Sequence, residues 1–344
     1  MASESLYRKY RPHTFLDVEG QEHITTVLSG AIEKGQVAHA YLFAGSRGLG
    51  KTSVARIFAR TLGCSDKDVI EMDAASHTGV DNMRELSENV YTLPFESPYK
   101  VYIIDEAHML SKSAWNAFLK TLEEPPSHVI FILATTELEK VPDTIISRCQ
   151  SFSFRAPSPA LLSKVVRGVA KKEGYALSED SAELVALLAE GSYRDALSIL
   201  QKVIIASVDK KIEVEEVERI TGAPRTALIR ALVTGIHTKD TDAVLASLHE
   251  ANDAGVSARL LLTLLLARLR AILLIRHSAR LKGDIKKESG EEYGWMEEIA
   301  EDHASGVSLP TLVALLESIR LVGYSPLPIL PIELALLRVL SKTA

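Results

Sequence analysis

The clearest chemical signal in the sequence is a glycine-rich segment that ends in a lysine and a threonine. Glycines allow several backbone N–H groups to point at one anion, and the N-terminus of a following helix adds partial positive charge. The lysine can contact the outer phosphates of a nucleotide, and the threonine hydroxyl can hold Mg²⁺. This pattern fits a phosphate loop, and we predict nucleotide contacts from Gly45, Ser46, Arg47, Gly48, Leu49, Gly50, Lys51, Thr52 and Ser53.

Two acids follow an apolar run further along the chain. Residues 101–104 are apolar, and Asp105 and Glu106 come directly after them. In a phosphate-loop protein such a strand lies beside the loop, so Asp105 would hold Mg²⁺ through water and Glu106 would orient or deprotonate an attacking water. Acids in this position can also simply cap a helix, but the phosphate loop upstream favours the catalytic interpretation.

Thr136 and Arg148 are two further candidates. Thr136 closes the apolar run 129–134, and from the end of a central strand it could reach a γ-phosphate or the attacking water. A threonine in a turn is the alternative. Arg148 follows a short helix-like segment and could be an arginine finger, which stabilises charge on the transferring phosphoryl group. Taken alone, it would more simply be a solvated surface arginine.

Arg194 lies near the start of a later helix. From there it could reach back to the nucleotide and report the nucleotide's state through movement of its own domain. The alternative is an ion pair with Asp195 or Glu190. That alternative is weak, because such close neighbours do not face each other on a helix.

The elements that would position these residues alternate in type. Apolar runs predict strands at 41–44, 69–72, 100–104 and 129–134, and helical spacing predicts helices at 52–62, 81–89 and 111–122, the last capped by Ser111. The strand before the glycine segment and the helix after it also argue against a simple glycine turn. Such alternation is typical of an α/β fold with a parallel sheet covered by helices.

Beyond two prolines at 157 and 159 the periodicity is only helical. Helices are predicted at 160–173, 178–188, 192–206, 214–220, 243–254, 257–277, 312–322 and 332–340, and the charged stretch 282–294 is predicted to be a surface loop. A second joint at 222–224 then divides the chain into three domains, 1–156, 157–222 and 223–344.

Composition restricts the class of protein. The 344 residues are 47% hydrophobic and carry a net charge of −6, so any contact with nucleic acid needs a local basic patch rather than an overall positive field. The two cysteines, Cys64 and Cys149, are far apart in the sequence, so no zinc site is expected. Their small number also favours a reducing, cytoplasmic compartment. The apolar stretch 260–275 is broken by Arg268 and Arg270, which predicts a buried helix and no membrane span.

Taken together, the motifs resemble those of the AAA+ ATPases of sliding-clamp loaders, and most closely the bacterial DNA polymerase III gamma/tau family. The phosphate loop is followed by Asp-Glu-Ala-His at 105–108, Ala-Thr-Thr at 134–136, Ser-Arg-Cys at 147–149 and Gly-Ser-Tyr-Arg-Asp-Ala at 191–196. Three more stretches are similar to family segments. Residues 7–21 resemble the N-terminal box that contacts adenine in this family. Residues 113–126 resemble the segment typical of the bacterial members, and residues 330–338 resemble the last collar helix.

This resemblance implies an α/β AAA+ P-loop domain, a small helical lid and a helical collar through which five subunits form an open ring. It implies that Lys51, Thr52, Asp105, Glu106 and Thr136 serve the subunit's own ATP, with Mg²⁺ at Thr52 and Asp105. Arg11 and Pro12 would line the adenine pocket, Arg194 would approach from the lid, and Arg148 would act on the nucleotide of a neighbouring subunit. The implied partners are delta and delta-prime subunits, copies of this chain, the sliding clamp and primer–template DNA.

Contacts with DNA and the clamp are placed by analogy alone. Ser76, His77, Thr78 and Arg84 lie on or beside the helix that would face DNA, although a solvated helix is an equal alternative. The clamp would contact residues 89–98, whose apolar members could equally belong to the core; these are Val90, Tyr91, Leu93 and Phe95.

The sequence departs from the family in two places. The family usually carries a four-cysteine zinc module after the first helix, whereas Cys64 is followed at once by Ser65, so that module is lost or absent from this sequence. The chain also stops at Ala344, just past the expected collar, which corresponds to a gamma-like length or a truncated form.

Two other classes of function compete with the clamp loader. Asp-Glu-Ala-His at 105–108 suggests a DEAH-type nucleic-acid helicase, but the sequence shows no second motor domain and its Ser-Arg-Cys element is foreign to that class. A non-hydrolysing scaffold subunit is the other alternative. That role usually accompanies an eroded phosphate loop, and here the loop is intact.

Overall fold

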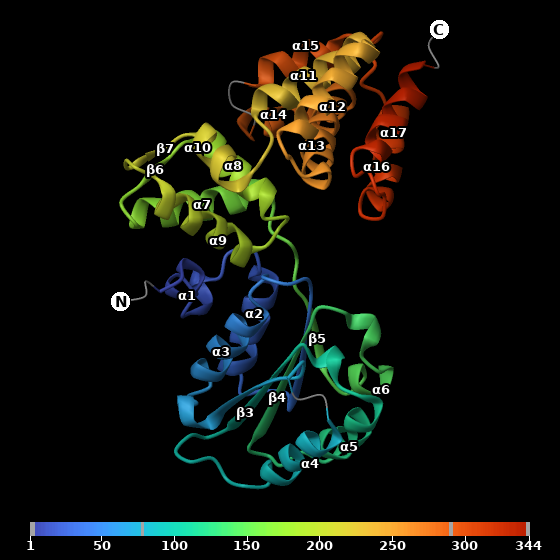
Figure 1. Ribbon diagram of the computed structural model, residues 1–344. Coiled ribbons are helices and arrows are strands. Elements are labelled where there is room, and N and C mark those ends of the chain that lie inside the picture. The colour runs from blue at the N-terminus through green and yellow to red at the C-terminus, as the bar shows by residue number, and fades with distance from the viewer. Residues whose placement is uncertain (1–3, 77–78, 289–291, 342–344) are drawn as a thin grey trace. The chain divides into compact units, whose positions relative to one another are not determined.

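The computed structural model describes residues 4–76, 79–288 and 292–341 (Figure 1). It divides into two compact units, one made of Met1–Leu162 with Ala189–Ser198 and the other of Ser163–Leu188 with Ile199–Ala344. The first unit contains the main sheet, and the second is almost entirely helical. The division into three domains at 156 and 222 remains a prediction.

A five-stranded parallel sheet forms the centre of the first unit, in the order β2-β3-β4-β1-β5. The four predicted strands are confirmed as β1 (Ala40–Ala44), β2 (Val69–Asp73), β3 (Lys100–Asp105) and β4 (Val129–Thr135). The fifth, β5 (Gln150–Ser153), was not predicted from the sequence. It is an edge strand that pairs only with β1, and three of its four residues are exposed, so it lacks the continuous apolar run of the central strands.

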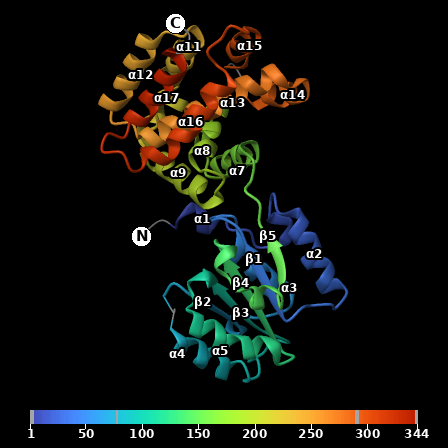
Figure 2. The ribbon, with the colours of Figure 1, turned by 90° about the vertical axis from the view of Figure 1, so that its right-hand side faces the viewer.

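Helices cover both faces of this sheet (Figure 2). The residues of β1 alternate between two apolar clusters, because successive side chains of a strand point to opposite faces. Leu42 packs in the cluster that includes Phe118 of α5, whereas Phe43 packs in the one that includes Phe58 of α3. The helical elements of this unit are α1 (Leu6–Lys9), η1 (Phe15–Asp17), α2 (Glu22–Glu33), α3 (Lys51–Thr61), η2 (Asp66–Asp68), α4 (Val80–Asn89), η3 (Ala107–Met109), α5 (Lys112–Glu123), η4 (Leu138–Lys140) and α6 (Asp143–Ile146).

Local sequence explains where α3 and α5 begin. Ser111 precedes α5, and its side chain accepts a hydrogen bond from the Ala114 N–H at 3.2 Å, which confirms the predicted cap. α3 begins directly after Gly50, whose φ of 95° is a left-handed conformation that glycine adopts without strain. The phosphate loop therefore leads straight into the N-terminus of α3.

The second unit packs helices against helices. α13 contacts α11, α14, α15 and α16, and its buried leucines confirm the buried helix predicted at 257–277. Over the described ranges, no helix is long and apolar enough to cross a membrane. The helices that belong wholly or partly to this unit are α7 (Pro159–Lys172), α8 (Glu179–Leu188), α9 (Tyr193–Ala206), α10 (Val214–Thr221), α11 (Thr226–Thr238), α12 (Thr241–Asp253), α13 (Ala258–His277), α14 (Ala279–Glu288), α15 (Tyr293–Glu301), α16 (Leu309–Val322) and α17 (Leu330–Leu340).

Two expectations for this unit were wrong. The charged stretch 282–294 is not a loop, because α14 extends to Glu288 and α15 begins at Tyr293. The polar composition reflects a mostly exposed helix in which Ile285 supplies the buried contact. A short parallel pair, β6 (Ala176–Leu177) with β7 (Lys211–Ile212), also interrupts the helical region, and two-residue strands are too short to give an alternating pattern.

Candidate nucleotide site

The register of the sheet brings the predicted site residues to one edge. Ala44 lies opposite Thr135, and Ile104 lies opposite Leu133, so β1, β3 and β4 end together. The Gly45 N–H donates to the Thr135 carbonyl at 3.1 Å, which joins the start of the phosphate loop to the end of β4. In parallel α/β sheets this carboxyl edge is where ligands bind. Residues 45–53, Asp105, Glu106 and Thr136 therefore share one location.

The phosphate loop requires glycine at position 48 for two reasons. Gly48 has φ of 79°, and a Cβ atom there would lie 2.0 Å from the Ser192 Oγ. The Gly48 carbonyl also accepts the Tyr193 N–H at 3.1 Å. A larger residue would therefore break the contact between the loop and the start of α9, which lies in the same compact unit.

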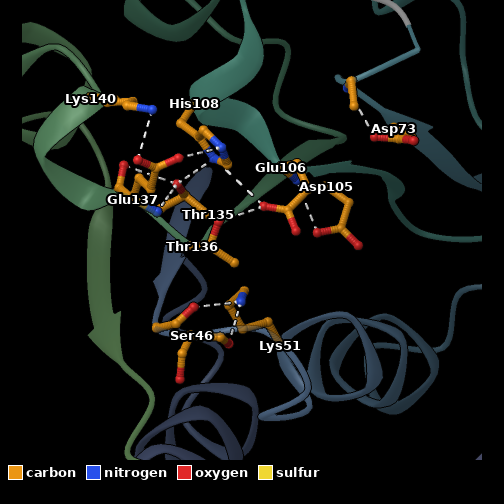
Figure 3. Close-up of polar contacts among 12 residues, drawn as sticks. Ser46, Lys51, Asp73, Asp105, Glu106, His108, Thr135, Thr136, Glu137 and Lys140 are labelled. Carbon is orange, nitrogen blue, oxygen red and sulfur yellow. Dashed lines mark hydrogen bonds and ion pairs between the residues drawn. The ribbon is translucent and has the colours of Figure 1, made fainter. Parts of the chain in front are cut away.

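Lys51 is buried inside the loop, with 5% of its surface exposed. Its Nζ donates to the carbonyls of Gly45 at 2.6 Å and Ser46 at 2.9 Å (Figure 3). Burial lowers the pKa of Lys51, while the carboxylates of Glu106 and Asp105 act in the opposite direction. The ammonium is thus held at the centre of the glycine turn, where backbone N–H groups and the α3 N-terminus favour an anion.

The oxygen atoms beside the loop fit a magnesium ion. The Thr52 Oγ1 donates to the Asp105 Oδ2 at 2.8 Å, so a hydroxyl and a carboxylate already face one another. Mg²⁺ prefers such oxygen ligands and is commonly bound by one or two protein groups together with substrate phosphates. Among the residues that the structure describes, no group of three or more His, Cys, Asp or Glu side chains could hold a metal ion. Thr52 and Asp105 could hold Mg²⁺ together with nucleotide oxygens.

Glu106 and Thr136 contact each other at the same edge of the sheet. The Thr136 Oγ1 donates to the Glu106 Oε2 at 3.0 Å, which links the ends of β3 and β4. Glu106 has φ of 48°, an uncommon conformation for a residue other than glycine. Strain of this kind is typical of functional sites, and the Glu106 side chain points toward Thr136 (Figure 3).

His108 belongs to this cluster but was not assigned a role from the sequence. Its Nδ1 lies 3.1 Å from the Thr135 Oγ1 and 3.5 Å from the Glu106 Oε2, and its Nε2 lies 3.2 Å from the Glu137 Oε1. The motif at 105–108 could have drawn attention to it. Sequence alone gives no indication that Glu137, 29 positions later, lies on the other side of the ring.

The N-terminal segment and Arg194 also lie in the unit that holds the phosphate loop. The Tyr193 hydroxyl donates to the Glu19 carbonyl at 2.7 Å, and the Arg194 guanidinium lies 5.6 Å from the centroid of the Tyr7 ring. Burial lowers the pKa of Arg11, and the nearby charge of Arg56 adds to this effect. Pro12 is half-buried next to it.

Arg148 lies away from this edge. It stands two residues before the start of β5, and Gln150 of β5 pairs with Tyr41 near the beginning of β1. The phosphate loop follows the other end of β1. The guanidinium of Arg148 donates to the Glu123 Oε1 at 2.6 Å and to the Thr144 carbonyl at 2.7 Å. The structure therefore does not bring Arg148 together with Lys51.

The candidate DNA residues are only partly described. The Ser76 Oγ donates to the Asp73 Oδ2 at 3.2 Å, and Arg84 is exposed on α4. His77 and Thr78 lie outside the described residues. The apolar members of 89–98 divide clearly: Val90 is fully buried, whereas Tyr91, Leu93 and Phe95 are 63%, 78% and 75% exposed.

An aspartate that was not singled out from the sequence anchors this exposed segment. The buried Asp68 accepts hydrogen bonds from the backbone N–H groups of Phe95 at 2.5 Å and of Glu96 and Ser97 at 3.0 Å. Burial opposes ionisation of Asp68, but these bonds and the Ser97 side chain outweigh it and lower its pKa to about 2. Asp68 holds the segment from 27 positions away in the sequence, a distance over which no local pattern applies.

Comparison with known proteins gives the chain its family. Residues 212–344 match the family model described as "DNA polymerase III subunits gamma and tau domain III", and residues 20–78 and 66–158 match the one described as "DNA polymerase III, delta subunit". The DNA polymerase III subunit gamma of Buchnera aphidicola is 34% identical over 99% of both chains. The chain belongs to the DNA polymerase III gamma/tau family.

Other gamma/tau relatives are longer. The DNA polymerase III subunit tau of Bacillus subtilis is 42% identical to this chain, and the match covers 85% of the chain and 55% of the relative. The chain thus spans about half the length of the first curated relatives that it matches.

A solved structure supports the AAA+ fold of this gamma/tau chain. The RuvB Holliday junction branch migration motor of Thermotoga maritima aligns with a TM-score of 0.53 over 72% of this chain and 88% of that chain, at 21% identity. At this identity the likeness concerns the fold alone. It agrees with the parallel sheet and the phosphate loop described above.

Proposed function

We propose that this gamma/tau chain is the ATP-hydrolysing motor of a clamp loader, which uses ATP to open a sliding clamp and place it on primer–template DNA. The observation that carries the proposal is the convergence of Lys51, Thr52, Asp105, Glu106 and Thr136 at the carboxyl edge of one sheet. Family membership supports the same function. The delta and delta-prime subunits and further copies of this chain are the proposed partners, in a ring of five.

Each residue at this edge has a distinct proposed role. The buried Lys51 ammonium binds the outer phosphates, and the α3 N-terminus contributes partial positive charge to the same anion. Thr52 and Asp105 hold Mg²⁺, which when bound neutralises charge on the phosphate oxygens. Glu106 orients or deprotonates the attacking water, and Thr136 fixes the Glu106 carboxylate through its 3.0 Å hydrogen bond.

Arg148 and Arg194 complete the proposed site from two directions. Arg194, beside Tyr7, contacts the nucleotide of its own chain together with Arg11 and Pro12. Arg148 stands near the opposite edge of the sheet, so we assign it to the nucleotide of the neighbouring subunit. An isolated subunit should then hydrolyse ATP slowly, because the charge that stabilises the transferring phosphoryl group comes from another chain.

The ATPase rate of the assembled ring, measured with and without clamp and primed DNA, tests the proposal. We expect strong stimulation by both, loss of nucleotide binding and hydrolysis in Lys51→Ala, and near-normal behaviour in Lys34→Ala, which removes an exposed lysine at the end of α2. Asp105→Asn should weaken the dependence of nucleotide affinity on Mg²⁺. Tight ATP binding without any hydrolysis would instead indicate a scaffold subunit, and strand separation would indicate a helicase.

A further inference from the structure

His108 stands between two carboxylates. Its side chain is 7% exposed, with the Glu106 Oε2 3.5 Å from Nδ1 and the Glu137 Oε1 3.2 Å from Nε2 (Figure 3). Glu106 follows β3, whereas Glu137 lies just after β4 and forms an ion pair with Lys140 of η4 at 2.7 Å. The imidazole is therefore the physical link between the candidate base and the segment 137–140.

The atoms around the ring show how His108 is held. A carboxylate is only an acceptor, so a hydrogen bond to Glu137 requires a proton on Nε2, while Nδ1 lies 3.5 Å from the Glu106 carboxylate. The Thr135 hydroxyl, 3.1 Å from Nδ1, has one proton, and its geometry directs that proton to the Glu137 carbonyl at 3.2 Å. Oxygen atoms of three side chains therefore lie around the two ring nitrogens and fix the orientation of the imidazole.

We propose that His108 is a positioning residue for ATP hydrolysis, which lies between the Glu106 and Glu137 carboxylates and ties the orientation of Glu106 to Glu137 and Lys140. Thr136 and His108 contact the same oxygen, Oε2 of Glu106, at 3.0 and 3.5 Å. These two contacts occupy Oε2 and leave Oε1 as the atom that receives a proton from water. This inference rests on the proposed ATPase activity, because it explains how the carboxylate of Glu106, the proposed base of that reaction, is oriented.

The position of Glu137 would allow its contact with His108, and so the orientation of Glu106, to change. Its side chain is 39% exposed and its charge is shared between His108 and Lys140. Hydrogen bonds from Lys140 lower the pKa of Glu137, so it remains ionised at neutral pH. A movement of η4 would thus change the contact between Glu137 and the His108 imidazole, and through it the orientation of Glu106. This would need no contact between η4 and the nucleotide.

Kinetics of the full assembly test the functional half of this proposal. Replacing His108 with Leu should lower kcat about tenfold or more, a part of the roughly 10²–10⁴-fold attributed to a positioned acid or base, while nucleotide affinity changes less than about twofold. His108→Gln, which keeps an amide group that can donate hydrogen bonds, should recover part of the rate. Glu137→Gln should lower kcat in the same direction, and Glu139→Gln, an exposed neighbour on η4, should leave it unchanged. Unchanged kcat in both His108→Leu and Glu137→Gln would overturn the proposal.

A measurement without ATP separates this proposal from the function on which it rests. In the full chain labelled with ¹⁵N-histidine, the two His108 ring nitrogens give NMR signals that report on the groups next to each nitrogen. Glu106→Gln should shift the Nδ1 signal and Glu137→Gln the Nε2 signal, each by much more than Glu139→Gln does. If Glu106→Gln shifts the Nδ1 signal no more than Glu139→Gln does, His108 does not link Glu106 to Glu137, whatever the ATPase rate is. If the link is present but the assembly hydrolyses no ATP, the proposed function fails instead, and with it the role in hydrolysis.

Discussion

The Arg148 guanidinium donates to the Glu123 carboxylate of its own chain at 2.6 Å. Both side chains are substantially exposed, at 34% and 51%, and exposed ion pairs of this kind contribute only about 0–1 kcal/mol to stability. The pair therefore orients Arg148 at the surface without binding it tightly. An arginine held in this way remains available to a neighbouring subunit.

Arg148→Ala should lower the ATPase rate of the assembled ring by roughly 10³–10⁵, the range found for loss of an arginine finger. Nucleotide binding should survive, because the substitution leaves the phosphate loop of the same chain intact. Glu123→Gln is the matched variant, and it should change the rate only a few-fold and the unfolding free energy by less than about 1 kcal/mol. Steady-state ATPase assays and equilibrium nucleotide titrations measure the two effects. Equal loss of binding and hydrolysis in Arg148→Ala would contradict the assignment.

Arg194 should affect nucleotide affinity as well as rate, since we place it at the nucleotide of its own chain. Arg194→Ala should weaken ATP binding by about 1.5–3 kcal/mol, the value of a hydrogen bond to a charged group, and this loss should appear in the isolated subunit. Arg167→Ala, an exposed arginine on α7, serves as control. Fluorescence titration with a nucleotide analogue gives both affinities. An Arg194→Ala chain that binds as tightly as the native chain would place this arginine outside the site.

Asp68 should stabilise the protein by holding residues 95–97. Asp68→Asn places an amide donor against backbone N–H groups, and leaving buried donors unmatched should cost about 2 kcal/mol or more. Asp66→Asn, on the same 3₁₀ helix but exposed, should cost much less. Urea unfolding monitored by circular dichroism measures both.

The contribution of Asp68 to stability should also depend on pH. Its pKa is about 2 in the folded chain and 3.8 in an ordinary environment, so the folded state prefers the ionised form. This contribution is complete above about pH 4 and is lost as the pH falls toward 2. The difference in unfolding free energy between the native chain and Asp68→Asn should therefore shrink in that window. A difference that stays constant down to pH 2 would contradict the assigned hydrogen bonds.

The two cysteines should resist alkylation in the folded protein. Burial raises the pKa of Cys64 to about 11 and that of Cys149 to about 12, and only the thiolate reacts. At pH 8 labelling by iodoacetamide should be at least about a hundredfold slower than for a free cysteine with its pKa near 8.5. Mass spectrometry of native and urea-unfolded samples measures the rates, and rapid labelling of either thiol in the native sample would be the contrary result.

The family and the α/β fold could be predicted from the sequence because their signals are local. The phosphate loop is a run of consecutive residues, and the strands before Gly45, Asp105 and Thr136 are continuous apolar runs. Parallel strands bring their carboxyl ends together, so knowing the strands was enough to expect these residues at one edge. Edge strand β5 gave no such signal, because a strand with three exposed residues and one partly buried residue resembles a loop.

The tertiary structure alone decided which side chains touch. Only the packing of η3 against the end of β4 puts His108 between Glu106 and Glu137, and only the folding of η2 beneath the segment after α4 brings Asp68 to the N–H groups of residues 95–97. The physical reason is one of range. Periodicity and turn chemistry act over a few residues, whereas hydrogen bonds between distant segments depend on strand order and register, which burial of the whole apolar surface determines.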